Sequence, residues 1–167
     1  MNLFKYKNKI LYRILFTLFI VIFLQLPVYK AFGQSSGDTN ILTDEQKINN
    51  VLETYRQSSI NKDLISFMSC FSRDFKRDSI TYEIIENDVE KAFQSMDIVS
   101  CAISNVQITF NGETASVLCW QEIVRKDNKT GEIKKLCAEL ENLFKKEGVF
   151  WKIYCGFLVN YSINKLI

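Results

Sequence analysis

The spacing of apolar residues along the chain changes at Ile98. Before this residue, apolar positions recur every three or four residues, as they do on one face of an α-helix. From Ile98 onward they alternate with polar positions, as they do in β-strands buried on one face, and no helical run returns. The pattern therefore predicts a block of helices followed by a block of strands.

Three amphipathic helices are expected in the first block. The first is expected over residues 44–59, because Thr43 and Gln46 are spaced as in a capping box and apolar residues follow at helical spacing. Asp63 can cap a short second helix. A third helix is expected over residues 81–96, where one stripe of the helix is apolar.

A glycine-containing turn sets the expected pairing of the first two strands. Asn111-Gly112 is typical of a two-residue hairpin loop, and such a loop pairs Phe110 with Glu113. This register separates apolar from polar side chains, and a slip of one residue would destroy the separation. The expected apolar face consists of Val106, Ile108, Phe110, Ala115, Val117 and Cys119.

A second hairpin is expected around Glu147-Gly148. A loop there pairs Phe144 with Trp151 and again leaves one face apolar. Together the hairpins make a four-stranded antiparallel meander with one apolar face. Helices must cover that face, so the pattern predicts an α+β domain with three helices packed on one side of the sheet.

The first 33 residues have the layout of a secretory signal peptide. Basic residues precede an apolar run of about 11 residues over positions 14–24, and Ala31 and Gly33 form a small-x-small cleavage site. We expect cleavage after Gly33 and export to a periplasmic or extracellular location; the alternative is an uncleaved anchor, the only expected contact with a membrane. Four segments follow from this: a signal peptide (1–33), a polar linker (34–43), a globular domain (44–160) and a C-terminal tail (161–167).

Removal of the signal segment changes the charge of the protein. The whole chain has 21 basic and 19 acidic residues, and five of the basic residues but none of the acidic ones precede position 34. The exported part therefore carries a net charge of about −3. No basic cluster with interleaved aromatic residues remains, so nucleic acid is not an expected partner.

The five cysteines do not form a metal-binding pattern. The chain has no histidine and no CxxC motif, so we expect neither a metal site nor a cofactor. The expected register places Cys119 and Cys155 inward but two strands apart, about 9.6 Å at 4.8 Å per strand. A disulfide needs α-carbons within about 7 Å, so we expect mostly free, buried thiols.

Four segments of the chain resemble the nuclear transport factor 2-like superfamily. They are residues 51–55 in the first helix, residues 61–64 before the second, the hairpin over 108–115 and the closing hairpin over 146–153. The resemblance covers about residues 44–159, and the branch most similar to this chain is the polyketide-cyclase-like (SnoaL-like) domains, largely of unknown function. It implies a cone, in which a curved sheet wraps around helices and encloses a pocket, and dimerisation through the outer sheet face.

Enzymes of this superfamily, such as ketosteroid isomerase and scytalone dehydratase, use a pocket Asp, Tyr or His. Histidine chemistry is excluded because the chain has no histidine. The expected register places Glu122, Glu139 and Glu141 on the outer face of the sheet, away from the pocket. No carboxylate is therefore assigned to the inside, and no catalytic residue is predicted.

The expected inward face carries two neutral amides, Gln121 and Asn142, among apolar residues. An unpartnered buried amide costs about 1 to 3 kcal/mol, so these side chains need a partner, a water molecule or a ligand. Together with Tyr55 and Trp151 they are the candidate lining of a ligand pocket. The alternatives are that the amides are hydrated at the open end of the cone and that Trp151 packs in the core against Phe144.

The expected outer face carries more large apolar residues than a hydrated surface requires. Aromatic residues are frequent anchors of protein interfaces, so this face is the candidate surface for a homodimer or for another exported protein. Its candidate residues are Leu118, Trp120, Val124, Leu143, Phe150, Tyr154 and Leu158.

These observations favour an exported, non-catalytic domain, dimeric and able to bind a small apolar ligand. One alternative is a module that docks a partner on the outer sheet face. Another is a proton-transfer enzyme of the isomerase, cyclase or dehydratase type with Tyr55 as a donor, although no residue in the sequence stands out as its base.

Overall fold

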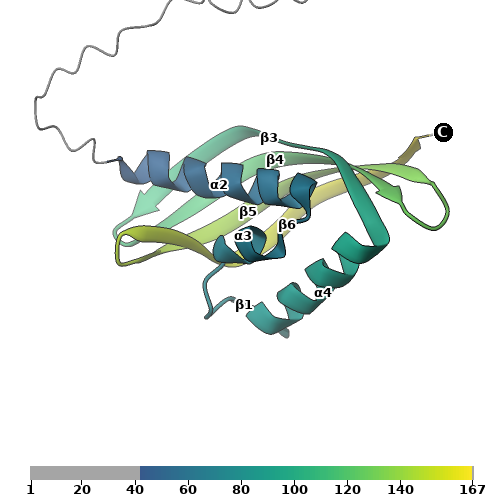
Figure 1. Cartoon of the computed structure of the whole chain (residues 1–167). Helices are drawn as coiled ribbons and strands as arrows, with labels where there is room; N and C mark the ends of the chain where they lie inside the picture. Colours follow the sequence, from purple (N-terminus) through teal and green to yellow (C-terminus); the bar gives the residue numbers. More distant parts are fainter. Residues whose placement is uncertain (1–41, 167) are drawn as a thin grey trace, which may run out of the picture. The chain divides into compact units, whose positions relative to one another are not determined.

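The computed structural model describes residues 42–166 and contains an α+β domain with a long antiparallel sheet (Figure 1). The expected signal peptide and nearly all of the expected linker lie outside the described residues. In chain order the elements are α2 (Asp44–Asn61), α3 (Leu64–Ser69), β1 (Lys76–Arg77), β2 (Ile80–Thr81), α4 (Tyr82–Ser95), β3 (Met96–Asn111), β4 (Thr114–Asp127), β5 (Ile133–Glu147) and β6 (Phe150–Leu166).

The three predicted helices are present, and the starts of the first two follow the predicted caps. Thr43 Oγ1 accepts a hydrogen bond from the Gln46 backbone N–H at 3.2 Å, and Gln46 Oε1 accepts one from the Thr43 N–H at 2.9 Å. This reciprocal pair satisfies two donors that a helix start leaves free. Asp63 caps α3 in a similar way, by accepting from the Ser66 N–H at 3.1 Å.

The sheet has the order β3-β4-β5-β6, with every neighbouring pair antiparallel. Its inner face packs against the helices, and α2 lies along that face (Figure 1). The core between the layers includes Ile48 of α2, Val117 of β4 and Phe144 of β5, none of which is exposed to solvent. Among residues 42–166, no helix is long and apolar enough to cross a membrane.

Both hairpin loops begin one residue later than predicted. Asn111 pairs with Thr114, so the first loop is Gly112-Glu113, and the second is Gly148-Val149. Each loop has its glycine first, at φ +61° and +65°. A positive φ at the first loop position is the requirement of the type II′ hairpin, which glycine meets without strain. The pairing therefore shifts by two residues, and because the shift is even, side chains beside the loops keep their predicted faces.

Bulges change the faces farther from the loops. The β3–β4 pairing shifts between Ser104 and Gln107, where Asn105 has φ 53°. As a result Val106, which was predicted to face inward, is exposed. Beyond the bulge Ile103 takes an inward position, opposite Gln121.

The β5–β6 pairing also shifts, between Leu143 and Phe144 and between Glu139 and Leu140. Because of the first of these shifts, Leu158 pairs with inward-facing Leu140 and lines the pocket, so its predicted place on the outer face is wrong. β6 then continues to Leu166, and most of the segment predicted as a C-terminal tail is strand.

The segment after α3 covers part of the β6 edge. The Ser72 N–H donates to the Ile153 carbonyl at 2.8 Å, and the Ile153 N–H donates to the Cys70 carbonyl at 2.9 Å. Backbone groups that an edge strand would expose are paired here. All five cysteines are free and buried.

Candidate ligand pocket

A pocket of about 290 Å³ lies between α2, the segment after α3 and the inner face of the sheet. The walls are mostly apolar, and four polar side chains stand among them: Tyr55, Arg77, Gln121 and Asn142. A mainly apolar cavity with a few convergent polar groups is the usual form of a small-molecule site. The apolar walls include Leu52, Phe71, Phe75, Ile103, Leu140 and Ile153.

Three of the four predicted pocket residues, Tyr55, Gln121 and Asn142, line this pocket. Tyr55 comes from α2, and its ring packs on Phe67 with centroids 4.8 Å apart. Burial raises the pKa of Tyr55 to about 12, although hydrogen bonding with the Gln121 side chain opposes part of this rise. The Tyr55 phenol is therefore neutral near neutral pH and can donate a hydrogen bond.

Gln121 is 6% exposed and lines the pocket together with Tyr55. Its Nε2 also donates to the Cys101 Sγ at 3.8 Å. The predicted need of this buried amide for partners is thus met by the phenol and the thiol. Burial raises the pKa of the Cys101 thiol, so its sulfur is a neutral acceptor.

Asn142 lies in a different environment from Gln121. It pairs with Gly156 across the β5–β6 ladder, and its side-chain amide makes no hydrogen bond with any residue in the described part of the chain. A Cβ atom at position 156 would lie 2.8 Å from Asn142 Oδ1. Glycine at this position therefore leaves space for the amide at the pocket surface.

Arg77 was not predicted as a pocket residue. It lies in the two-residue strand β1, in a polar stretch that carries no periodic pattern, so the hydrophobic spacing gave no indication of it. Its guanidinium lies over the Phe157 ring, 5.8 Å from the ring centroid. The only available signal was the local cluster of basic residues at positions 73, 76 and 77.

The carboxylates predicted to lie on the outer face are there. Glu122 pairs with Lys135 at 2.7 Å, and Glu141 accepts from the Ser116 hydroxyl at 2.8 Å. No Asp or Glu is among the residues that line the pocket. Within residues 42–166, no group of three or more Cys, Asp or Glu side chains could hold a metal ion.

Trp151, the fourth predicted residue, lies elsewhere. It is 1% exposed, packs edge-on against Phe110 at 5.8 Å and borders a second groove of about 410 Å³. The indole nitrogen lies beside the Asp44 carboxylate and is the largest influence that lowers the pKa of Asp44, to about 2. The geometry between the two groups is nevertheless not that of a hydrogen bond. The buried Trp151 Nε1–H therefore has no hydrogen-bond partner among residues 42–166.

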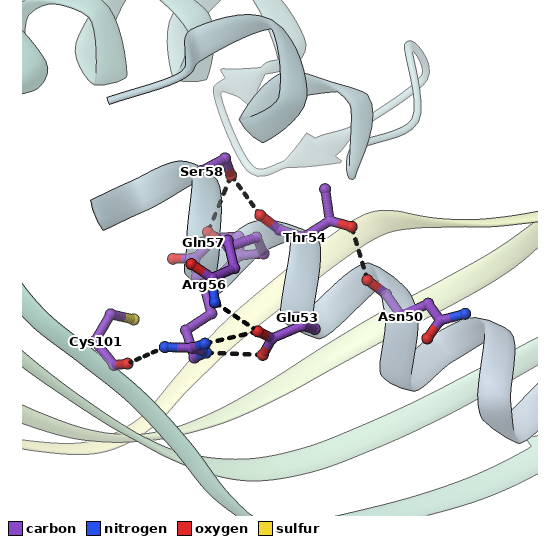
Figure 2. A network of polar contacts seen from close by, with 8 residues as sticks. Asn50, Glu53, Thr54, Arg56, Gln57, Ser58 and Cys101 are labelled. Carbon is purple, nitrogen blue, oxygen red and sulfur yellow. Dashed lines mark hydrogen bonds and ion pairs between the residues drawn. The ribbon is translucent and has the colours of Figure 1, made fainter. Parts of the chain in front are cut away.

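A polar network on α2 fixes the helix that carries Tyr55 (Figure 2). Arg56 binds Glu53 through two hydrogen bonds, of 2.7 and 2.6 Å, and its third contact reaches the Cys101 carbonyl at 3.4 Å. Arginine suits this role because its planar guanidinium can bind a carboxylate with two donors at once. The network links α2 to β3 at Cys101, the residue whose thiol accepts from Gln121.

The outer-face residues are distributed as follows. Phe150 is 64% exposed at the start of β6, and Leu158 faces the pocket. Leu118 and Trp120 are half-buried, and they pair across the ladder with Glu141 and Glu139. The other three members, Val124, Leu143 and Tyr154, are also half-buried.

The fold of this chain is the nuclear transport factor 2-like, or cystatin-like, fold. The chain is similar to a conserved protein from Planctomyces limnophilus (TM-score 0.64, 15% identity, covering 74% of this chain and 98% of that one). It is also similar to a ketosteroid isomerase-like protein from Erwinia carotovora atroseptica (0.57, 13%, 75% and 99%) and to a nuclear transport factor 2-like protein from Cytophaga hutchinsonii (0.57, 14%, 70% and 98%). No protein-family model and no curated protein sequence matches the chain. At these identities the likeness establishes the fold alone.

Proposed function

We propose that this chain is an exported, non-catalytic domain that binds a small, largely apolar molecule in the pocket between α2 and the inner sheet face. The observation that supports this function is the composition of the pocket wall. Its apolar side chains can bury a ligand, and its polar groups are a phenol, two amides and one guanidinium. Such a wall can orient a ligand without a group that would take a proton from it.

The rival function is proton transfer, and it draws on the fold of a ketosteroid isomerase-like neighbour. A general base must lie within hydrogen-bond reach of the proton that it removes. The residues that line the pocket supply no carboxylate, and the whole chain has no histidine. Tyr55, with its raised pKa, is suited to donate a hydrogen bond and not to accept a proton. Ligand binding is therefore the better-supported function.

Filling the pocket tests this proposal. Leu140→Trp places a large side chain inside the cavity, whereas Thr109→Trp places the same side chain on the exposed outer face of β3. Binding of the neutral fluorophore phenylnaphthylamine is followed by its emission, with circular dichroism to confirm folding. We expect at least about tenfold weaker binding to Leu140→Trp, a loss of about 1.4 kcal/mol, and unchanged binding to Thr109→Trp. Equal binding to all three proteins would contradict the proposal.

The second candidate function is association with another copy through the outer sheet face. Half-buried Leu118 and Trp120 stand there among polar groups that bind within the chain, such as Glu122 with Lys135. Because such charges are already paired within one copy, covering the outer sheet face with a second copy costs less free energy of desolvation. A two-fold pairing would present the same patch from each copy and bury both patches at once.

A further inference from the structure

We propose that the ligand of the pocket carries a carboxylate, which Arg77 binds. This inference rests on the proposed ligand-binding function and names the class of ligand. The apolar body of the ligand would lie along the inner sheet face, toward Tyr55 and Gln121.

Arg77 is a cation at the pocket wall without an anion. It is half-buried, and no carboxylate among residues 42–166 forms an ion pair with it. A partly desolvated charge is costly unless an opposite charge accompanies it. The planar guanidinium can offer two parallel donors, which match the two oxygens of a carboxylate.

The acidic side chains around Arg77 already have other partners or lie in solvent. Asp74 pairs with Lys145 at 2.7 Å, and Glu141, which pairs with Phe157 across the ladder, accepts from Ser116. Asp78, which follows Arg77 in the turn, is exposed. The charge of Arg77 is therefore left for a ligand.

Asn142 is a second polar group of the pocket wall without a partner. The ring of Phe157, over which the Arg77 guanidinium lies, pairs across the ladder with Glu141, the neighbour of Asn142 in β5, so Arg77 and Asn142 line the pocket at the same level of the sheet. The Asn142 amide has no hydrogen-bond partner in the described part of the chain, and glycine at position 156 leaves space beside it. The guanidinium and the amide are two polar groups of an apolar pocket wall that have no hydrogen-bond or ion-pair partner in the described part of the chain.

The part of the pocket beside Gln121 is less suited to an anion. Val117 is the β4 partner of Asn142, and Gln121 lies four residues farther along the same strand. At about 3.4 Å per residue, Gln121 is therefore about 14 Å from Val117 along β4. Gln121 is already engaged with Tyr55 and Cys101. Cys119 and Leu140, paired between these two levels of the sheet, give the middle of the pocket an apolar surface. An amphipathic ligand therefore fits in one direction, with its head at Arg77.

The test compares three ligands that share one apolar body: hydrocinnamate, hydrocinnamamide and phenethyl phosphate. Their affinities are measured by calorimetry for the wild type, Arg77→Met, Arg77→Lys and the control Arg73→Met, whose arginine lies over the Tyr82 ring and does not line the pocket. We expect the wild type to bind the carboxylate at least about tenfold more tightly than the amide, as a charge-assisted pair would. Arg77→Met should abolish this preference, Arg77→Lys should keep part of it, and Arg73→Met should leave it unchanged.

The other outcomes separate this inference from the proposed function. Equal affinity of the wild type for the acid and the amide would overturn the carboxylate assignment and leave ligand binding in place. So would a preference that survives in Arg77→Met, or tighter binding of the phosphate than of the carboxylate. Both the carboxylate assignment and the proposed ligand binding would be overturned by two results together. Phenylnaphthylamine would bind Leu140→Trp and Thr109→Trp equally well, and none of the three ligands would bind.

Discussion

Gly156 lies opposite Asn142 in the β5–β6 ladder, so close that a methyl group on Gly156 would come within 2.8 Å of the Asn142 Oδ1 atom. The φ of this glycine is not in the left-handed region, unlike that of the loop glycines. Its requirement is therefore for space, and not for an unusual backbone conformation. The side-chain amide of Asn142, which lines the pocket, occupies the space that Gly156 leaves.

This relationship predicts coupling between the two residues. Gly156→Ala should destabilise the protein by about 1 kcal/mol through crowding, and the cost should nearly vanish in an Asn142→Ala background, where the crowded atom is gone. Urea unfolding of the wild type, the two single variants and the double variant gives the coupling energy, expected at about 0.5 to 1 kcal/mol. An equal cost of Gly156→Ala in both backgrounds would show that the amide is not the obstacle.

Acid should weaken the fold through two carboxylates of α2. Hydrogen bonds from Arg56 are the main cause that lowers the pKa of Glu53 from 4.5 to about 2. The side chains of Trp151 and then Lys47 contribute most to lowering the pKa of Asp44 from 3.8 to about 2. A lowered folded-state pKa means that the unfolded chain binds more protons in this range. Stability should therefore be fully present above about pH 4.5 and fall as the pH decreases toward 2.

Urea midpoints measured between pH 6 and pH 3 test this expectation. Glu53→Gln should reduce the slope of stability against pH, because the neutral amide has no proton to gain. Glu45→Gln, on an exposed position of the same helix, is the matched control and should change the slope less. A slope that is the same in the wild type and in Glu53→Gln would rule out a contribution from the network in Figure 2.

Association through the outer sheet face predicts a dimer in solution. Trp120→Lys places a charge at the centre of the apolar patch and should weaken the dimer by at least about tenfold, since central aromatic residues carry much of the energy of an interface. Asn49→Lys adds the same charge at an exposed position of α2, on the other side of the sheet, and should leave the dimer intact. Sedimentation equilibrium distinguishes these outcomes, and a monomeric wild type would refute the association.

Export with cleavage after Gly33 predicts that the mature protein begins at Gln34. Expression of the full chain in a secreting host, followed by intact-mass measurement, gives the new N-terminus. Gly33→Arg should block cleavage, because the site requires a small residue there, whereas Gly37→Arg should not. A cell-associated protein that retains residues 1–33 would instead support the uncleaved anchor.

The helices and the sheet order could be predicted because each depends on local signals. Thr43 and Asp63 mark helix starts, and the change from helical to alternating spacing marks the start of the sheet. The loops were placed one residue early, because Asn111-Gly112 fits a type I′ turn as a sequence, while the structure uses Gly112 at the first position of a type II′ turn.

The pocket was predictable only in part. Tyr55, Gln121 and Asn142 follow from periodicity, since each is a polar group at an inward position. Arg77 could not be found in this way, because β1 has two residues and no period. Leu158 was misplaced because the single shift between Leu143 and Phe144 reverses the alternation between the hairpin loop and the pocket, and no residue type in the sequence marks such a shift.

The bulge in β3 divides one strand into two segments of opposite phase. Even-numbered Ile108 and odd-numbered Ile103 both pack against the same core, because the irregularity between Ser104 and Gln107 lies between them. Deletion of one residue from this irregularity would restore a regular strand and turn one of the two isoleucines toward solvent. The length of the chain at this point is therefore as much a determinant of the pocket wall as the identity of any residue in it.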